Sequence, residues 1–524
     1  MDHIELVVLF LLVAVAALSA LARVLNVPYP ILLVVGGSLV GFAPGVPDVS
    51  LDPDVVLLIF LPPLLYGAAF FTSLRDLRRN ARPIALLSIG VVLATMLAVA
   101  FVAHHAIGLG WAEAFVLGAV VSPTDAVAPA EILRRIGAPH RMLAVIEGEN
   151  LTNDWTALVL YRVAVAAVVS GSFSLAEAGL KFIWSGVGGL LVGLAAGLII
   201  REVRRRVDDP PTEFTISLLS GYAAYLPAEE IGVSGVIAAV TVGIYIGWHT
   251  PELTTPVTRL QGIAIWEVLT FLLNALLFLL VGLQLPSVID NISGHSAGEL
   301  IGWGLLISAV VIGVRLVWQF TVVYVIRAID RREAQRARRA TWQQRLVGGW
   351  AGMRGAVSLA AALAIPLHTD SGADFPDRDL IIFLTYSVLL ATLVGQGLTL
   401  GPLINMLGIE DDGSEEREEV AARVRVAEAA IARTAELDGE DWVRPDTLDR
   451  VRALYDYRRR RFGAIGDGDG SEYEERSGAY IRLMYELFDA QREALVGMRN
   501  AGEISDEVRR RVERDLDLEE SRLG

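Results

Sequence analysis

The sequence of 524 residues contains no cysteine and a single lysine, Lys181. The absence of cysteine excludes disulfide scaffolds, iron–sulfur clusters, zinc sites with thiolate ligands and cysteine nucleophiles. Because Lys181 is followed by Phe182, the chain has no Walker A loop, which argues against direct drive by ATP. Arginine is interleaved with acidic residues and the formal net charge is −15, which argues against nucleic-acid binding. We therefore expect no cofactor and no nucleic-acid partner.

Long hydrophobic runs are abundant, and they end near Gly408. Residues 1–409 carry 25 basic and 29 acidic side chains, whereas residues 410–524 carry 20 and 31, so the differences of −4 and −11 add to −15. The last part of the chain is thus rich in charge, and its apolar residues recur at helical spacing. We predict a transmembrane domain over residues 1–409 and a charged, helical cytoplasmic tail over residues 410–524.

Thirteen hydrophobic stretches are candidates to cross a hydrocarbon layer of ~30 Å, which takes about 20 helical residues. The first stretch, 4–22, lacks the basic residues that precede the apolar part of a signal peptide, so we expect a retained helix. Alternate loops hold 20 arginines against two basic residues in the opposite loops, which predicts an outside N-terminus and a cytoplasmic C-terminus. The stretches begin near Ile4, Pro28, Val55, Pro83, Trp111, Met142, Lys181, Thr212, Ile231, Ile263, Leu300, Leu346 and Leu380.

Ionisable groups are costly within a membrane span, so those that the chain places there are functional candidates. In a first cluster, Ser122–Pro129, two prolines remove backbone donors and break the helix, which frees carbonyl oxygens inside the membrane. Asp125 adds a carboxylate at this break and Thr124 adds a hydroxyl. A proline kink with a capping aspartate is the alternative. Free carbonyls beside a carboxylate favour a cation site.

A second cluster occupies residues 147–154. Its polar residues are Glu147, Glu149, Asn150, Asn153 and Asp154. On a helix these side chains cover two adjoining faces, and Asp154 lies roughly 20 Å beyond Arg141, which is at the cytoplasmic side. Three acids so close together cannot all ionise unpaired at this depth, so a proton or a cation must be held there. The alternative is that these groups only join helices through hydrogen bonds.

A third cluster, Gly352–Ser358, places Arg354 roughly 14 Å beyond Arg345 along a helix. Because an arginine does not lose its proton, Arg354 needs a buried acidic partner, and Glu149 or Glu147 is the natural candidate. The flanking glycines allow this second segment to unwind. A snorkelling arginine is the alternative reading.

We assign no role in transport to the other polar residues of the membrane spans. Arg162 and Arg315 are interpreted as ion-paired or snorkelling residues, and Glu229, Glu230 and Glu267 as interfacial residues. Gly232–Gly235 is similar to the serine motif of intramembrane proteases, but that chemistry needs a histidine base nearby, and His249 lies about 22 Å along the same helix. Small residues at a helix contact explain the motif, so we expect no enzyme.

In these clusters the sequence resembles the monovalent cation/proton antiporters of the NhaP and Na⁺/H⁺-exchanger type. The matching segments lie in order within residues 4–409 and are Ser122–Pro129, Glu147–Leu158, Phe271–Leu285 and Gly352–Pro366. The resemblance implies an all-α polytopic membrane protein of the NhaA/NhaP-like fold. It would have about 13 transmembrane helices with inverted repeats, two broken helices that cross, and a separate domain that forms a homodimer.

The resemblance also implies roles for individual residues. Asp154 would bind the cation and the proton in turn, and Asp125, Thr124 and Asn150 would help to bind the cation. Asn153 would support the site, and Glu149 and Arg354 would form a stabilising ion pair. Three positions depart from the usual pattern. Asn150 stands where serine is frequent, Gly67 where many relatives have glutamate, and Trp155 where a small residue is usual.

The expected function is secondary active antiport of Na⁺, with Li⁺ as a further candidate, for H⁺ across the bacterial cytoplasmic membrane. The Asn153–Asp154 pair is similar to that of electroneutral one-for-one exchangers, and pH and sodium homeostasis is the expected role. A K⁺/H⁺ antiporter is the alternative within this class. A cation channel or sensor gated by the tail is the alternative outside it. The expected partners are the cation, the proton, the lipid bilayer and a second copy of the chain.

Overall fold

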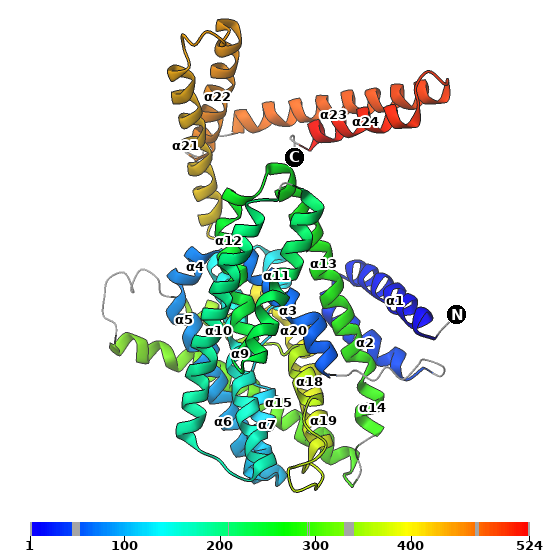
Figure 1. The fold of residues 1–524 in the computed structure, drawn as a ribbon, viewed down its shortest axis with the longest axis vertical. Coiled ribbons are helices and arrows are strands. Elements are labelled where there is room, and N and C mark those ends of the chain that lie inside the picture. Colours follow the sequence, from blue (N-terminus) through cyan, green and yellow to red (C-terminus); the bar gives the residue numbers. More distant parts are fainter. Residues whose placement is uncertain are drawn as a thin grey trace. The chain divides into compact units, whose positions relative to one another are not determined.

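The computed structural model describes residues 3–43, 53–207, 209–290, 292, 294–329, 340–466 and 471–521. Within these residues the chain is helical and forms no β-strand, apart from an isolated bridge between His368 and Asp374. It divides into two compact units, Met1–Asp411 and Asp412–Gly524 (Figure 1). Residues 330–339, which contribute to the arginine bias between loops, lie outside the described residues.

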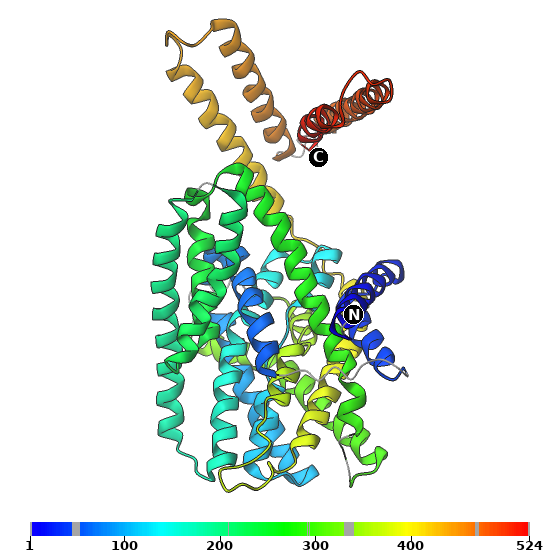
Figure 2. The same ribbon diagram turned by 45° about the vertical axis from the view of Figure 1, so that its right-hand side comes forward.

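The first unit is a bundle of helices (Figure 2). Its first half contains α1 (His3–Leu25), α2 (Tyr29–Gly41), α3 (Pro53–Phe71), α4 (Leu74–Arg79), the continuous segment α5–η1–α6–η2 (Ala81–Ile107), α7 (Trp111–Val120), α8 (Val127–Ile136), α9 (His140–Ser170) and α10 (Leu175–Arg204). Its second half contains α11 (Pro210–Glu230), α12 (Gly235–Leu253), α13 (Pro256–Leu283), α14 (Leu285–Asp290), α15 (Ala297–Ile329), α17 (Trp342–Trp350), α18 (Ala356–Leu363) and the continuous segment α19–η3–α20 (Arg378–Met406).

Local sequence explains where several of these helices begin. Ser174, Asp209, Ser234 and Thr255 each accept a hydrogen bond at the N-terminus of α10, α11, α12 and α13, respectively, and so satisfy a backbone N–H that has no partner within the helix. Thr341 forms a capping box at the start of α17. Prolines in the first turns of α11 and α13 fit there because those positions donate no helical hydrogen bond.

Each of the thirteen predicted stretches contains helix. By length and composition, five described helical segments are long and apolar enough to cross a membrane, and several shorter apolar helices accompany them. The five segments are Ala81–Ile107, Leu175–Arg204, Pro256–Asp290, Ala297–Val322 and Arg378–Met406. The segment Leu175–Arg204 exposes large apolar side chains such as Leu190, Leu191 and Leu198, as a lipid-facing helix does. The number of thirteen membrane crossings and the inverted repeats stay predictions.

Two of the predicted stretches are interrupted helices. The first stops at Val120 and resumes at Val127, and the second stops at Trp350 and resumes at Ala356. The two breaks contact each other, because the backbone N–H of Asp125 donates to the carbonyl of Met353 over 2.9 Å. A Cβ atom on Gly355 would lie 2.5 Å from the Cβ atom of Asp125, so this close approach requires glycine.

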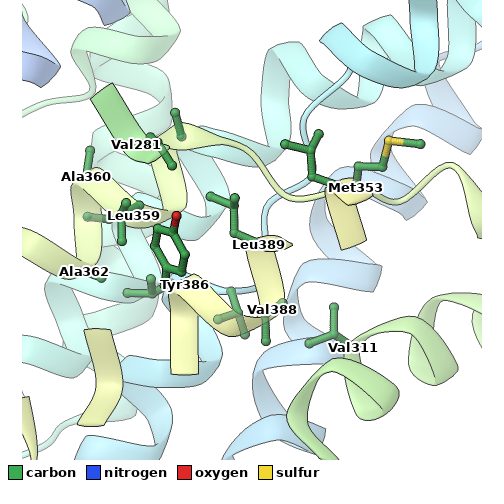
Figure 3. Close-up of a cluster of buried hydrophobic side chains, with 14 of the residues drawn as sticks. Val281, Val311, Met353, Leu359, Ala360, Ala362, Tyr386, Val388 and Leu389 are labelled. Carbon is green, nitrogen blue, oxygen red and sulfur yellow. The ribbon is translucent and has the colours of Figure 1, made fainter. Parts of the chain in front are cut away.

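The apolar core of this unit surrounds the second break. Figure 3 shows Leu359, Ala360 and Ala362 of α18 beside Tyr386 and Leu389 of α19. The Tyr386 hydroxyl hydrogen-bonds to the Ser38 hydroxyl of α2 over 2.8 Å, so the polar end of this buried ring is satisfied. The core therefore holds the broken segment against intact helices.

The second unit consists of α21 (Ser414–Glu436), α22 (Pro445–Gly466), α23 (Ser471–Asn500) and α24 (Asp506–Glu520). The helices α21 and α22 pack together, and so do α23 and α24 (Figure 1). Phe488, Leu495 and Leu516 form a small buried core between α23 and α24. Arg492 pairs across these two helices with Asp517 and Glu520.

Candidate functional site

A cavity of about 150 Å³ lies where the two helix breaks meet α3, α9, α13 and α18. Apolar residues such as Leu61 of α3 and Phe278 of α13 form much of its wall. Its polar lining residues are Thr124, Asp125, Asn150, Asp154, Thr270, Asn274 and Ser358. The four residues for which the sequence predicts cation binding thus surround one cavity, although they come from a helix break and a separate intact helix.

Asp154 is the acidic residue of α9 that faces this cavity. It is 5% exposed, and no described residue donates a hydrogen bond to its carboxylate. Asn150 precedes it by one helical turn and lines the same cavity. A carboxylate removed from water and without donors is stabilised when a proton or a cation neutralises it. The geometry therefore leaves Asp154 in need of a small cationic ligand.

Asp125 is fixed by the unwound chain on both sides. Its Oδ1 atom accepts a hydrogen bond from the backbone N–H of Val127 over 2.9 Å, while its own N–H donates to Met353. One carboxylate oxygen therefore holds the start of α8, and Oδ2 is left for a ligand in the cavity.

Thr124 and Asn153 join the first break to α9. The Thr124 hydroxyl donates to Oε1 of Glu149 over 2.9 Å and accepts from Nδ2 of Asn153 over 2.8 Å. The same amide donates to the Thr124 carbonyl over 2.8 Å. These hydrogen bonds use the hydroxyl proton of Thr124 and one lone pair each of its hydroxyl and carbonyl oxygens. Each of the two oxygens therefore keeps one lone pair for a cation.

The predicted ion pair between Glu149 and Arg354 is wrong. Glu149 pairs with Arg315 of α15, whose Nη1 and Nη2 atoms donate over 2.5 and 2.8 Å to the two carboxylate oxygens. Arg354 instead donates to the carbonyls of Val121 and Gly352, and no described carboxylate lies within salt-bridge distance of it. Carbonyls freed by the two helix breaks take the place of an acid, because they point into the same buried space.

The interpretation of Arg315 as an ion-paired residue is confirmed, but no partner and no place beside the site could be assigned to it from the sequence. Arg315 is 1% exposed and lies within a membrane-spanning stretch. Because arginine keeps its charge, a buried Arg315 needs an acidic partner. Arg315 is 166 residues from Glu149 in the sequence, so the sequence does not show whether Arg315 or Arg354 is the partner of Glu149. Glu147, the other candidate partner for Arg354, pairs with Arg134 and does not line the cavity.

Of the three positions that depart from the usual pattern, Asn150 lines the cavity, whereas Trp155 and Gly67 do not. The Trp155 ring packs against Phe182 of α10, with ring centroids 4.4 Å apart. A Cβ atom on Gly67 would lie 3.0 Å from Cζ3 of the buried Trp266 ring, so that ring fills the space next to the glycine. Among the described residues, no three acids or histidines cluster as a metal site, so an alkali ion in the cavity would need amide and hydroxyl oxygens as well.

The family model described as sodium/hydrogen exchanger, transmembrane, matches residues 9–406. The chain belongs to this family. An uncharacterised Na⁺/H⁺ exchanger of Mycobacterium tuberculosis is 39% identical over 522 residues, which are 99% of this chain and 96% of that protein. The exchanger YjcE of Escherichia coli is 30% identical, with 98% of each chain covered.

The fold is also that of a solved member of this class. The structure of the sodium proton antiporter MjNhaP1 from Methanocaldococcus jannaschii matches with a TM-score of 0.61 and 19% identity, and covers 78% of this chain and 99% of that one. The sodium/hydrogen exchanger chain described here is thus a multi-pass membrane protein with an NhaP-type helical fold, and its family is one of transporters.

Proposed function

We propose that this exchanger carries Na⁺ and H⁺ in opposite directions through one shared site at Asp154. The observation that carries the proposal is the Asp154 carboxylate, which is buried beside Asp125 and Asn150 and has no donor among the described residues. The proton and the cation neutralise the same carboxylate, so each excludes the other. If the helices around the cavity rearrange only when Asp154 is neutral, each cycle moves one ion each way.

The proposed stoichiometry is one Na⁺ for one H⁺. It is supported by Asn153, which stands next to Asp154 and uses its amide to hold Thr124. An amide does not titrate, so this neighbour adds no second proton to the exchange.

K⁺ is the alternative cation. A relative from Bacillus subtilis, 34% identical over 75% of this chain and 60% of that protein, is named a sodium, potassium, lithium and rubidium/H⁺ antiporter. The amide of Asn150 at the proposed site supplies a neutral oxygen that several alkali ions accept. A cation channel is the alternative from another class, but the polar residues described around Asp154 gather in one cavity.

The proposed setting is the bacterial cytoplasmic membrane, with the N-terminus outside and the tail in the cytoplasm. A homodimer and a role in pH and sodium homeostasis belong to the same proposal, as does the division at residues 409 and 410 into an exchanger domain and a tail. The support for the orientation is the bias of arginines between alternate loops.

Exchange is testable with purified protein in liposomes that hold an acid interior and a trapped pH dye. We expect external Na⁺ to alkalinise the interior, and the rate to be unchanged when valinomycin and matched K⁺ clamp the membrane potential. Runs with Li⁺, and with K⁺ under a clamp that does not use K⁺, name the cation. A channel would fail to concentrate Na⁺ against its gradient in a counterflow version of this assay.

The decisive variant is Asp154→Asn. We expect it to fold and to show no exchange, because the amide has the same size but binds neither a proton nor a cation by charge. Glu230→Gln, an exposed acid at the end of α11, is the matched control and should exchange normally. Residual exchange by Asp154→Asn would remove Asp154 from the mechanism.

A further inference from the structure

We infer that Asn274 of α13 is a further ligand of the transported monovalent cation and determines how tightly the cation binds. Asn274 lines the same cavity as Asp154 and Asp125 and is 8% exposed. No described residue forms a hydrogen bond with its side-chain amide. The side chain of this buried residue therefore lines the cavity beside the acidic residues without a protein partner for its amide.

A further ligand is needed because hydrogen bonds within the protein already use several of the oxygens around the cavity. Hard cations take several oxygen ligands at once. In this cavity Thr124 is largely occupied by Glu149 and Asn153, and one oxygen of Asp125 holds Val127. The lining side chains whose oxygens have no protein partner among the described residues are Asn150, Asp154, Thr270, Asn274 and Ser358, and Asn274 is the one of these that adds an amide oxygen from α13.

Packing alone does not explain an asparagine at this position. Its neighbours on α13 include Ala275, Leu277 and Phe278, all of them buried and apolar. A buried amide without a partner lowers stability, so a leucine would suit this helix better unless the amide meets a ligand. Ser358 also lines the cavity and its hydroxyl has no partner, but that oxygen is enclosed by protein atoms, whereas no side-chain atom of Asn274 is among the enclosed atoms without a partner.

The position of α13 gives this ligand a distinct role. The other polar ligands come from the first break and α9, whereas α13 packs against α2 and α3. A cation held by Asp154 and Asn274 would therefore join two groups of helices, and a proton on Asp154 would not need the amide. Loss of Asn274 should weaken cation binding and leave the protonated half of the cycle intact.

This inference rests on the proposed exchange, and two readouts separate them. Asn274→Leu, Asn274→Asp and the control Asn405→Leu, an exposed position of α20, are purified at full length. The first readout is the apparent KM for Na⁺ and the kcat of exchange in liposomes. The second is the rise in melting temperature on adding NaCl, with choline chloride as reference, which reports binding without transport.

We expect Asn274→Leu to raise the KM roughly tenfold at nearly unchanged kcat, since it removes one dipole ligand from a charge. It should also lose most of the stabilisation by Na⁺, whereas Asn274→Asp, which keeps an oxygen, and Asn405→Leu should retain it. If the leucine variant does not fold, Asn274→Ala takes its place. An unchanged KM and unchanged Na⁺ stabilisation, or a fall in kcat alone, would overturn the inference.

The two proposals fail in different ways. If the wild type shows no exchange but is stabilised by Na⁺, the proposed function fails, and the melting temperatures of the variants still decide the role of Asn274. A wild type that neither exchanges nor is stabilised by Na⁺, Li⁺ or K⁺ overturns both.

Discussion

At the scale of single residues, the pair Glu149–Arg315 is a buried ion pair next to the cavity. Both side chains are almost fully buried, and Glu149 also accepts the hydrogen bond that orients Thr124. The pair thus links α9 and α15 to the first break. Because two charges removed from water depend on each other, the loss of one partner should cost far more than the loss of both.

Arg315→Met should lower the free energy of unfolding by about 3–5 kcal/mol, because it leaves Glu149 buried without its partner. The double variant Glu149→Gln with Arg315→Met should recover much of this loss. Thermal unfolding in detergent measures both.

The matched control is Arg162→Met. Arg162 also forms an ion pair, with Glu229 over 2.7 Å, but its side chain is 49% exposed. Its loss should cost clearly less than the loss of Arg315, because the half-exposed Glu229–Arg162 pair is not enclosed by protein as the Glu149–Arg315 pair is. Equal costs for Arg162→Met and Arg315→Met would contradict the supporting role of the buried pair.

At the scale of elements, the two helix breaks make the site possible. Each break is short, and their contact depends on the hydrogen bond from Asp125 to Met353 and on the absence of a side chain at Gly355. Non-helical backbone is tolerated inside a membrane protein when other protein groups form hydrogen bonds with its N–H and C=O groups. Here the two breaks do this for each other, because the Asp125 N–H donates to the Met353 carbonyl and the Arg354 side chain donates to the Val121 carbonyl.

A second prediction follows for Gly355→Ala. The added methyl would lie 2.5 Å from both Cβ and Oδ2 of Asp125, so the first break must shift. We expect a fall in exchange of roughly tenfold or more, since small displacements of ligands have large effects on a site. Gly395→Ala is the control, because a Cβ atom there meets nothing within 4 Å and the liposome rate should stay normal. Normal exchange by Gly355→Ala would show that the breaks need not touch.

The sequence was informative about the elements and less so about their pairing. Pro123 and the paired glycines around Arg354 predicted both breaks, because proline and glycine act on the local backbone. The acids of α9 could be placed on helix faces from their spacing alone. The partner of Glu149 and the contribution of Asn274 depend on which distant helices pack together. The sequence of an apolar helix with one polar residue does not predict which helices it packs against.

At the scale of the whole molecule, the chain consists of two units with separate hydrophobic cores. All residues that line the cavity lie between Leu61 and Ser358, within the first unit. The described core of α23 and α24 consists of tail residues. Neither core therefore depends on the other for its apolar contacts.

The last prediction concerns a chain that ends at Asp411. We expect it to fold and to keep Na⁺-dependent exchange in liposomes, because it retains the cavity, both breaks and the Glu149–Arg315 pair. Asp154→Asn in the shortened chain should abolish that exchange, which controls for leak. A change only in the response to cytoplasmic pH would assign the tail to regulation. Complete loss of exchange by a folded, shortened protein would instead mean that the tail completes the transport machinery, and that the boundary between the two units is not a functional one.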